Sequence, residues 1–219
     1  MTDYKVWGIP GSPFVRKLLV VLEEKGLPYT YKFVNIFPTP DGFEKINPMK
    51  RVPVLEVGEG EYLADTTAIC LFLEREHPEP SLYPRDNREL AKAMMWEEYA
   101  DTELALCFGM RLFRPLVVAQ LMGKTPDLER VKKTLRELPA IYDTLSSRLD
   151  GREYFSGDTF GIVDISIATQ FVNLKYAGFS PSPEHYPELA GFLERVLGRE
   201  SFVGLLKREK LPPPIAVDE

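Results

Sequence analysis

A serine–proline pair lies where a short apolar segment is followed by an amphipathic one. Val6 to Ile9 has the pattern of a buried strand and Phe14 to Lys25 that of a helix, so Ser12 and Pro13 fall at the helix start. Serine accepts hydrogen bonds from the free N–H groups of a first turn, and proline suits the first helical position. The helix dipole also attracts anions to this end. Ser12 is therefore either a simple cap or a hydroxyl that donates to a bound anion.

Two basic side chains stand just ahead of the next apolar strand. Lys50 and Arg51 precede the segment Val54 to Val57. They could meet a carboxylate of a ligand, or they could be solvated surface charges. Val52 and Pro53 lie between them and the strand, where a trans proline that opens an edge strand is the ordinary interpretation.

A second helix start carries an acid and a hydroxyl. Asp65 and Thr66 follow the strand pattern Tyr62 to Ala64 and open a helix pattern that reaches Glu76. Thr66 could offer its hydroxyl and backbone N–H to a carboxylate, and Asp65 could pair with an amine. Simple capping by either residue is the alternative.

The elements around these segments change character along the chain. Residues 4–80 alternate two patterns, with strands at 6–9, 29–36, 54–57 and 62–64 and helices at 14–25 and 66–76. Prolines mark a linker at 81–87. Beyond it only helix patterns occur, at 88–120, 127–149, 162–176 and 187–197, and Pro139 should kink the second of these. This order predicts an α/β domain at 1–80 followed by an all-helical domain at 88–219.

Composition excludes several classes of protein. The chain has 219 residues, a hydrophobic share of 44% and a net charge of −6 without a cluster of lysine and arginine, so no nucleic-acid partner is expected. No apolar run reaches membrane-spanning length, and no secretory signal pattern opens the chain, which predicts a cytoplasmic protein without a membrane partner. Cys70 and Cys107 lie far apart in apolar helix patterns, as buried thiols do, and no metal-ligand spacing occurs.

Several motifs, in this order and spacing, resemble the glutathione S-transferase family of the serine type over nearly the whole chain. The motifs are Ser12-Pro13-Phe14-Val15-Arg16, Asn47-Pro48, Arg51-Val52-Pro53-Val54-Leu55, Asp65-Thr66, Gly157 to Asp164, and Tyr186-Pro187-Glu188-Leu189. The resemblance implies a thioredoxin-like N-terminal domain that binds glutathione as co-substrate, and an all-helical C-terminal domain. Gly161 replaces the usual serine or threonine cap of the family's folding motif, which predicts a weakened cap and an intact helix.

The resemblance also assigns roles to the residues of the three segments. Ser12 would stabilise the glutathione thiolate, and Arg51, with Lys50 as its rival, would meet the glycine carboxylate. A cis peptide at Val52-Pro53 would turn backbone groups toward the cysteinyl part of the tripeptide. Asp65 and Thr66 would bind the γ-glutamyl amine and carboxylate, although the family usually has Glu-Ser here and the shorter aspartate weakens the expectation for the amine.

An apolar electrophile would occupy a pocket between the two domains. Its expected walls are Phe14, the loop at Phe37 and the long helix after the linker, with Tyr99 and Arg111 as candidates. The implied reaction is conjugation of glutathione to that electrophile, a detoxification reaction, in a cytoplasmic homodimer whose sites lie near the interface. Two alternatives remain on the same fold: an interaction domain without catalysis, and a glutathione-dependent isomerase or dehalogenase.

Overall fold

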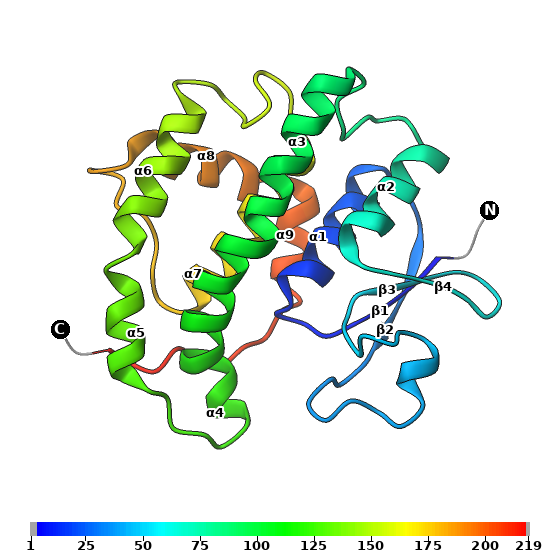
Figure 1. Ribbon diagram of the computed structural model, residues 1–219, viewed down its shortest axis with the longest axis horizontal. Coiled ribbons are helices and arrows are strands. Elements are labelled where there is room, and N and C mark those ends of the chain that lie inside the picture. Colours follow the sequence, from blue (N-terminus) through cyan, green and yellow to red (C-terminus); the bar gives the residue numbers. More distant parts are fainter. Residues whose placement is uncertain (1–3, 218–219) are drawn as a thin grey trace.

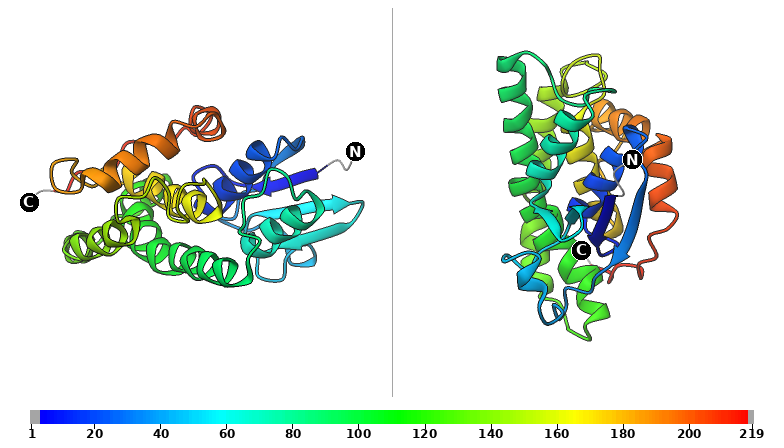
Figure 2. Two further views of the ribbon diagram at one scale, coloured as in Figure 1. Left: turned by 90° about the horizontal axis from the view of Figure 1, so that it is seen from above. Right: turned by 90° about the vertical axis from the view of Figure 1, so that its right-hand side faces the viewer.

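The computed structural model describes residues 4–217 and has two units side by side (Figures 1 and 2). The first unit has the elements β1 (Tyr4–Gly8), α1 (Pro13–Glu24), β2 (Tyr29–Phe33), the 3₁₀ turn η1 (Phe43–Lys45), β3 (Val54–Gly58), β4 (Glu61–Ala64) and α2 (Thr66–Glu76). The strands form one mixed sheet in the order β2-β1-β3-β4. Strand β1 pairs in parallel with β2 and antiparallel with β3, and β3 pairs antiparallel with β4.

Successive side chains of β1 point to opposite faces of this sheet. Tyr4 and Val6 are buried in the main core with Leu18 and Val21 of α1, which is the apolar face that the sequence predicts for that helix. Trp7 belongs instead to a second apolar cluster, with Phe43 from the long connection between β2 and β3. That connection therefore packs on the sheet although it contains only one helical turn.

The second unit is entirely helical, as predicted. It contains α3 (Asn87–Tyr99), η2 (Ala100–Val118), α4 (Ala119–Leu121), α5 (Leu128–Leu135), α6 (Leu138–Leu149), α7 (Ile162–Tyr176), α8 (Pro187–Leu197) and α9 (Glu200–Leu206). Helix α7 is the centre of the unit, since every residue from Ile162 to Leu174 is buried. Figure 1 shows η2 in front of it and α9 beside α1 of the first unit.

The elements α3, η2 and α4 run as one continuous helix from Asn87 to Leu121. Its middle part, η2, is wound as a π-helix, so that Ala119 N–H donates to the carbonyl of Arg114, five residues earlier. One series of fully buried residues in η2 recurs every four positions: Ala100, Leu104, Phe108, Leu112 and Leu116. Val117 is fully buried as well.

Two expectations about the helices were wrong. The pattern at 127–149 is two helices, because α5 ends at Leu135 and α6 begins at Leu138 with Pro139 in its first turn, where a proline starts a helix rather than kinks one. The helix Asn87–Leu121 is long and apolar enough, by length and composition, to cross a membrane, because an 18-residue window within it has a mean hydropathy of 1.5. It is nevertheless a core helix here, since its buried side packs against α7.

Buried charges join the two units. The guanidinium of Arg16 on α1 pairs with Glu209, at 2.7 Å, and Lys17 pairs with Glu97 and Asp101 of the long helix, at 2.7 and 2.6 Å. At the C-terminal end of α1, Glu24 pairs with Arg199 at 2.8 Å. Arg199 directly precedes α9. Helix α1 is therefore held by the second unit along its whole length.

Candidate functional site

Ser12 caps α1, as the sequence predicts. Its backbone is extended, with φ −75° and ψ 120°, and its Oγ accepts a hydrogen bond from Val15 N–H at 3.4 Å. Gly11, with φ +81°, makes the turn that leads into it, a conformation that favours glycine. Ser12 is half-buried, and within the described part of the chain its hydroxyl hydrogen is donated to no acceptor. One lone pair therefore caps the helix while the O–H remains a donor for a ligand.

The loop before β3 has the backbone form that the resemblance implies. The Val52-Pro53 peptide is cis. Asn47, which is only 1% exposed, shapes the preceding turn: its Nδ2 donates to Arg51 O at 2.8 Å and its Oδ1 accepts from Met49 N–H at 3.0 Å.

The two basic side chains of this loop are both exposed. Lys50 Nζ lies 3.7 Å from Glu44, whereas no described carboxylate pairs with Arg51. Arg51 is therefore the better placed of the two to receive an anionic ligand.

The start of α2 combines a cap with an uncommon backbone angle. Asp65 has φ +74°, a conformation that is rare outside glycine, and its Oδ1 accepts from Ala68 N–H at 3.1 Å. Thr66, the first residue of the helix, is buried, while Asp65 is exposed. Both residues thus act at the helix start that the sequence predicts, and Asp65 has its second carboxylate oxygen left for another partner.

Strand pairing brings the three segments to one end of the sheet. Trp7 in β1 pairs with Val54 in β3, and Val54 pairs with Ala64 in β4. Ser12 follows the end of β1, Val52-Pro53 precedes β3 and Asp65-Thr66 follows β4, so all of them lie beyond this one row of residues. Ser12 therefore lies at the same end of the sheet as two segments that follow it by 40 or more residues.

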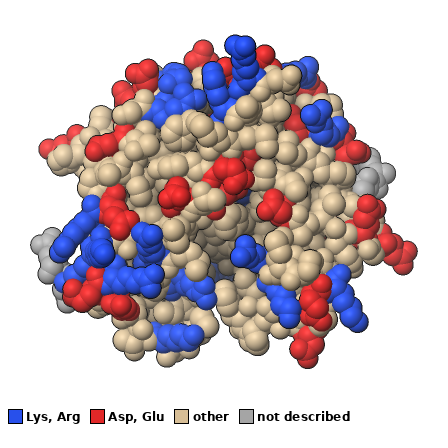
Figure 3. Space-filling view, viewed as in Figure 1, with Lys and Arg blue, Asp and Glu red and all other residues tan. Residues whose placement is uncertain are grey.

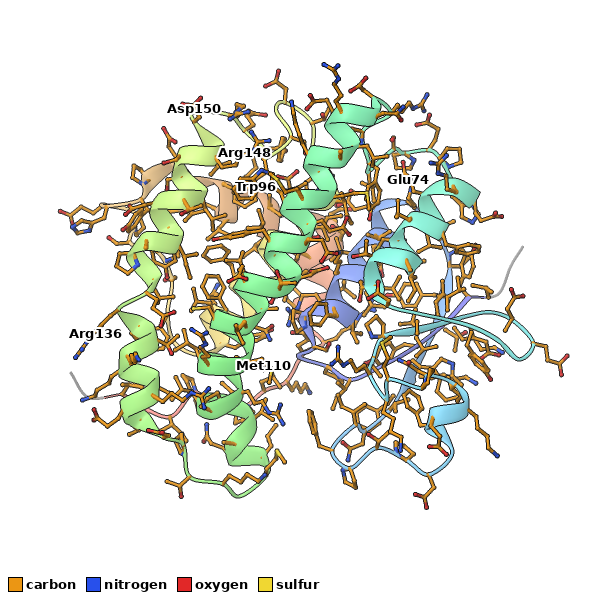
Figure 4. The ribbon with its side chains drawn as sticks, in the orientation of Figure 1. Glu74, Trp96, Met110, Arg136, Arg148 and Asp150 are labelled. Carbon is orange, nitrogen blue, oxygen red and sulfur yellow. The ribbon has the colours of Figure 1, made fainter. Side chains whose placement is uncertain are left out.

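The long helix faces this end of the sheet with Met110 and Arg114. The guanidinium carbon of Arg114 lies 5.3 Å from the centre of the Phe37 ring, and Arg114 also contacts Met110 Sδ at 4.0 Å. Figure 3 shows the surface hollowed between the two units, and Figure 4 shows Met110 beside this gap. Phe37 of the first unit and Met110 and Arg114 of the long helix thus form an exposed apolar and cationic wall at this gap.

Tyr99 and Arg111, which the sequence places in the same pocket, each have a partner within the second unit. Arg111 pairs with Glu137 between α5 and α6, at 2.8 Å. Tyr99 packs edge-to-face on Trp96, which itself lies beside Phe155 and Arg148 (Figure 4). The place of Tyr99 and Arg111 in the pocket stays a prediction.

Phe14 is half-buried in the first turn of α1. It lies two residues after Ser12, at the same end of the sheet. Its role in the electrophile pocket stays a prediction.

Beneath the site lies a buried lysine that the sequence does not reveal. Lys17 has no exposed surface and sits between Glu97 and Asp101. Burial by itself would lower its pKa, but attraction to the two carboxylates outweighs burial and raises it. Burial raises the pKa of Asp101. The attraction of Lys17 and a hydrogen bond with Thr67 lower this pKa, but they offset the effect of burial only in part. A lysine in an amphipathic helix resembles a solvated one, so only the packing of the long helix identifies this cluster.

Two surface hollows lie away from these segments. A cavity of about 360 Å³ lies between the linker, α3 and α6 near Trp96 and Arg148, and one of about 340 Å³ lies under the β2–β3 connection near Trp7 and Phe43. Neither cavity is lined by Ser12, Arg51 or Asp65. Among the described residues no group of three or more histidine, cysteine or acidic side chains could hold a metal ion.

Comparison with known proteins agrees with the geometry of both units. Residues 11–76 match the family model "Glutathione S-transferase, N-terminal domain", and residues 128–195 match "Glutathione S-transferase, C-terminal domain".

Individual relatives agree along most of the chain. Glutathione S-transferase U22 of Arabidopsis thaliana is 30% identical over 88% of this chain and 84% of its own length. The probable glutathione S-transferase DHAR1, cytosolic, of Oryza sativa subsp. japonica is 29% identical over 87% of this chain and 82% of its own. The crystal structure of a glutathione S-transferase from Rhodospirillum rubrum F11 superposes with a TM-score of 0.89 at 27% identity, covering 96% of this chain and 94% of that one. The α/β unit with its helical partner, the three segments at one end of the sheet and these matches together establish that this chain belongs to the glutathione S-transferase family.

Proposed function

We propose that the protein is a glutathione transferase of the serine type, in which Ser12 stabilises the thiolate of glutathione for attack on an apolar electrophile. The observation that carries the proposal is the row Trp7, Val54 and Ala64, which gathers the three candidate segments at one end of the sheet. These segments offer a hydroxyl donor, a free guanidinium and a helix start, which suit a peptide with one thiol and two carboxylates.

The chemical groups of glutathione fit the residues in that arrangement. Arg51 faces solvent without a carboxylate partner among the described residues and would receive the glycine carboxylate. Thr66, at the start of α2, would bind the γ-glutamyl carboxylate, and Asp65 would bind the amine through its second oxygen. The backbone at Val52 and Pro53 would face the cysteinyl part of the ligand, and Lys50 is the rival of Arg51 for the glycine carboxylate.

Ser12 can supply the energy that ionisation of the thiol needs. A free thiol has a pKa of about 8.5, and lowering it to about 6.5 takes roughly 2.7 kcal/mol in favour of the anion. A hydrogen bond to a charged group contributes about 1.5–3 kcal/mol, and a helix N-terminus adds about 0.3–1 kcal/mol. One hydroxyl at the start of α1 is therefore sufficient without a general base.

The reaction is a substitution or an addition at an electrophilic carbon. With an aryl chloride, the sulfur forms the C–S bond, the C–Cl bond breaks, and chloride leaves with its electron pair, while the thiol proton passes to water. Phe14, Phe37, Met110 and Arg114 would hold the apolar electrophile in the gap between the units, and this proximity adds to the rate.

The chain length, the exposed surface and the relatives support three further parts of the proposal. The domains would span 1–80 and 88–219, with 81–87 as the linker. Met95 and Leu106, 60% and 43% exposed on the long helix, would be covered in a homodimer, and a monomeric mass by sedimentation would exclude that assembly. A cytoplasmic location and a role in detoxification complete the proposal, with fractionation of the native cell as the check on the location.

Replacement of Ser12 by alanine tests the proposal. In Ser12→Ala, kcat/KM with glutathione and a chromogenic aryl chloride should fall on the order of 10²-fold at pH 6.5, because each pKa unit of the thiol corresponds to about 1.4 kcal/mol. The loss should shrink toward pH 9, where glutathione ionises by itself. Ser147→Ala, on the surface of α6, is the matched control.

Two outcomes would contradict the enzyme. An unchanged rate in Ser12→Ala would remove this residue from the mechanism. Failure of millimolar glutathione to raise the melting temperature of the unaltered protein would instead favour the interaction domain without catalysis.

A further inference from the structure

Asn173 on α7 belongs to the second unit, yet it contacts the backbone just before Ser12 and the side chain of Arg16, one turn after Ser12. Its Nδ2 donates to the carbonyl oxygen of Gly11 at 3.1 Å, and its Oδ1 accepts from Arg16 Nη1 at 2.9 Å. Asn173 is 1% exposed. Because a carbonyl only accepts and a guanidinium only donates, these two partners fix the orientation of the amide. Helix α7 packs against α1 to make these contacts (Figure 1).

The contact to Gly11 bears on the position of Ser12 through a rigid part of the backbone. The carbonyl of Gly11 lies in the same peptide plane as the N–H of Ser12, so the hydrogen bond from Asn173 sets the tilt of that plane. On the other side, Arg16 N–H donates to the carbonyl of Ser12 at 3.0 Å, while its side chain is held by Asn173. Asn173 thus holds the peptide group before Ser12 directly, and it holds the side chain of the residue whose N–H binds the Ser12 carbonyl.

The local contacts of Ser12 would not hold it as firmly by themselves. Its Oγ lies 3.4 Å from Val15 N, and its own N–H reaches Ile9 O also at 3.4 Å, both beyond the usual length of a strong hydrogen bond. A hydroxyl whose capping bond is long can rotate or shift away from its ligand. A shorter local bond runs from Arg16 N–H to Ser12 O, at 3.0 Å, and the second unit adds the bond from Asn173 to Gly11 O, at 3.1 Å.

The surroundings of Asn173 make the anchor rigid. Arg16 Nη1 also donates to Thr169 O at 2.9 Å, and its Nε and Nη2 bind both carboxylate oxygens of Glu209 at 3.0 and 2.7 Å. Tyr176, one turn beyond Asn173 on α7, donates to the same carboxylate at 2.9 Å. A Cβ added at Gly11 would meet Leu211 at 3.2 Å, so the segment after α9 closes the turn from outside.

We infer that Asn173 is a positioning residue for the reaction: it sets the direction of the Ser12 hydroxyl toward the sulfur without touching the substrate. The inference rests on the proposed role of Ser12. Asn173 should therefore affect the ionisation of the bound thiol and the rate that depends on it, and it should leave the contacts to the carboxylates of glutathione unchanged.

Two variants of Asn173 remove the contact in different ways. Asn173→Ala deletes both hydrogen bonds, whereas Asn173→Asp keeps an acceptor for Arg16 and loses the donor to Gly11. In each, the apparent pKa of the bound thiol, from the pH dependence of kcat/KM and from thiolate absorbance, should rise by about half a unit to one unit. At pH 6.5 kcat/KM should fall about 3- to 10-fold, with KM for glutathione within about twofold. Ser166→Ala, which removes a buried hydroxyl without a partner from the same helix, should leave the thiol pKa unchanged.

A double-variant cycle separates positioning from general damage to the fold. Added to Ser12→Ala, Asn173→Ala should cause no further change in the thiol pKa, because the hydroxyl through which it acts is gone. An unchanged thiol pKa in a folded Asn173 variant, or an equal loss in both backgrounds, would overturn the inference while Ser12 keeps its role. A wild-type rate in Ser12→Ala would instead overturn the proposed function.

Discussion

The Ser12 hydroxyl can accept one hydrogen bond and donate another. Its oxygen accepts the capping hydrogen bond from Val15 N–H, and its hydrogen is left for a ligand. The capping role follows from sequence alone, since it needs only the next turn of helix. The ligand role depends on Val52-Pro53 and Asp65, which strand pairing brings to the same end of the sheet.

At the same scale, two arginines three positions apart on η2 provide a matched test of the electrophile wall. Arg114 stacks on Phe37, and Arg111 pairs with Glu137 on the opposite side. Arg114→Leu should change KM for the electrophile about 3- to 10-fold, since the cation–π contact that orders Phe37 is lost. Arg111→Leu should leave that KM unchanged and cost at most about 1 kcal/mol of stability. Steady-state kinetics at saturating glutathione measure both, and an equal effect of the two changes would refute the assignment of the wall.

At the scale of the elements, the start of α7 has a glycine cap for a reason that its motif alone does not reveal. Asp164 accepts hydrogen bonds from Gly161 N–H and from Phe155 N–H, each at 2.8 Å, so the helix is intact, as predicted. Gly161 has φ −160°, a conformation open to any residue, so its backbone is not the reason for glycine. The reason is space: an added Cβ would lie 2.8 Å from Leu82 O, which accepts from Ile162 N–H.

The crowding at Gly161 reverses a prediction made from capping preferences. Serine is the better cap, so Gly161→Ser would be expected to stabilise α7 by a few tenths of a kcal/mol. We expect instead a loss of about 1–3 kcal/mol, because the new Cβ must displace the linker carbonyl. Thermal or denaturant unfolding measures the change, and a higher melting temperature in the variant would show that the linker yields without cost.

On the scale of the whole molecule, ion pairs hold the first unit against the second. Arg199 donates to both carboxylate oxygens of Glu24 at 2.8 Å, and Ser201 donates to one of them at 2.5 Å. Burial alone would raise the pKa of Glu24, but the hydrogen bonds from Arg199 and Ser201 outweigh it and leave this pKa below its ordinary value. The unfolded chain therefore binds this proton more readily than the folded one.

The lowered pKa of Glu24 predicts a pH dependence of stability. The contribution of Glu24 should be complete above its ordinary pKa of 4.5 and should be lost as the pH falls through the lower folded value. Glu24→Gln should cost about 1 kcal/mol at pH 7 and flatten the decline of stability at acid pH. Denaturant unfolding between pH 3 and 7 measures this, with exposed Glu76→Gln as control. Parallel curves for the unaltered chain and Glu24→Gln would disprove the linkage.

The sequence by itself determined the order of strands and helices and the capping positions of Ser12 and Asp65. These features depend on residues within a turn or two of each other, so propensity and periodicity are sufficient to predict them. Only the tertiary structure decided which side of the long helix faces the site, that Lys17 is buried, and that Asn173 holds the turn at Ser12. Each of these depends on a partner far along the chain or on the wide winding of η2, and a local pattern carries no information about either.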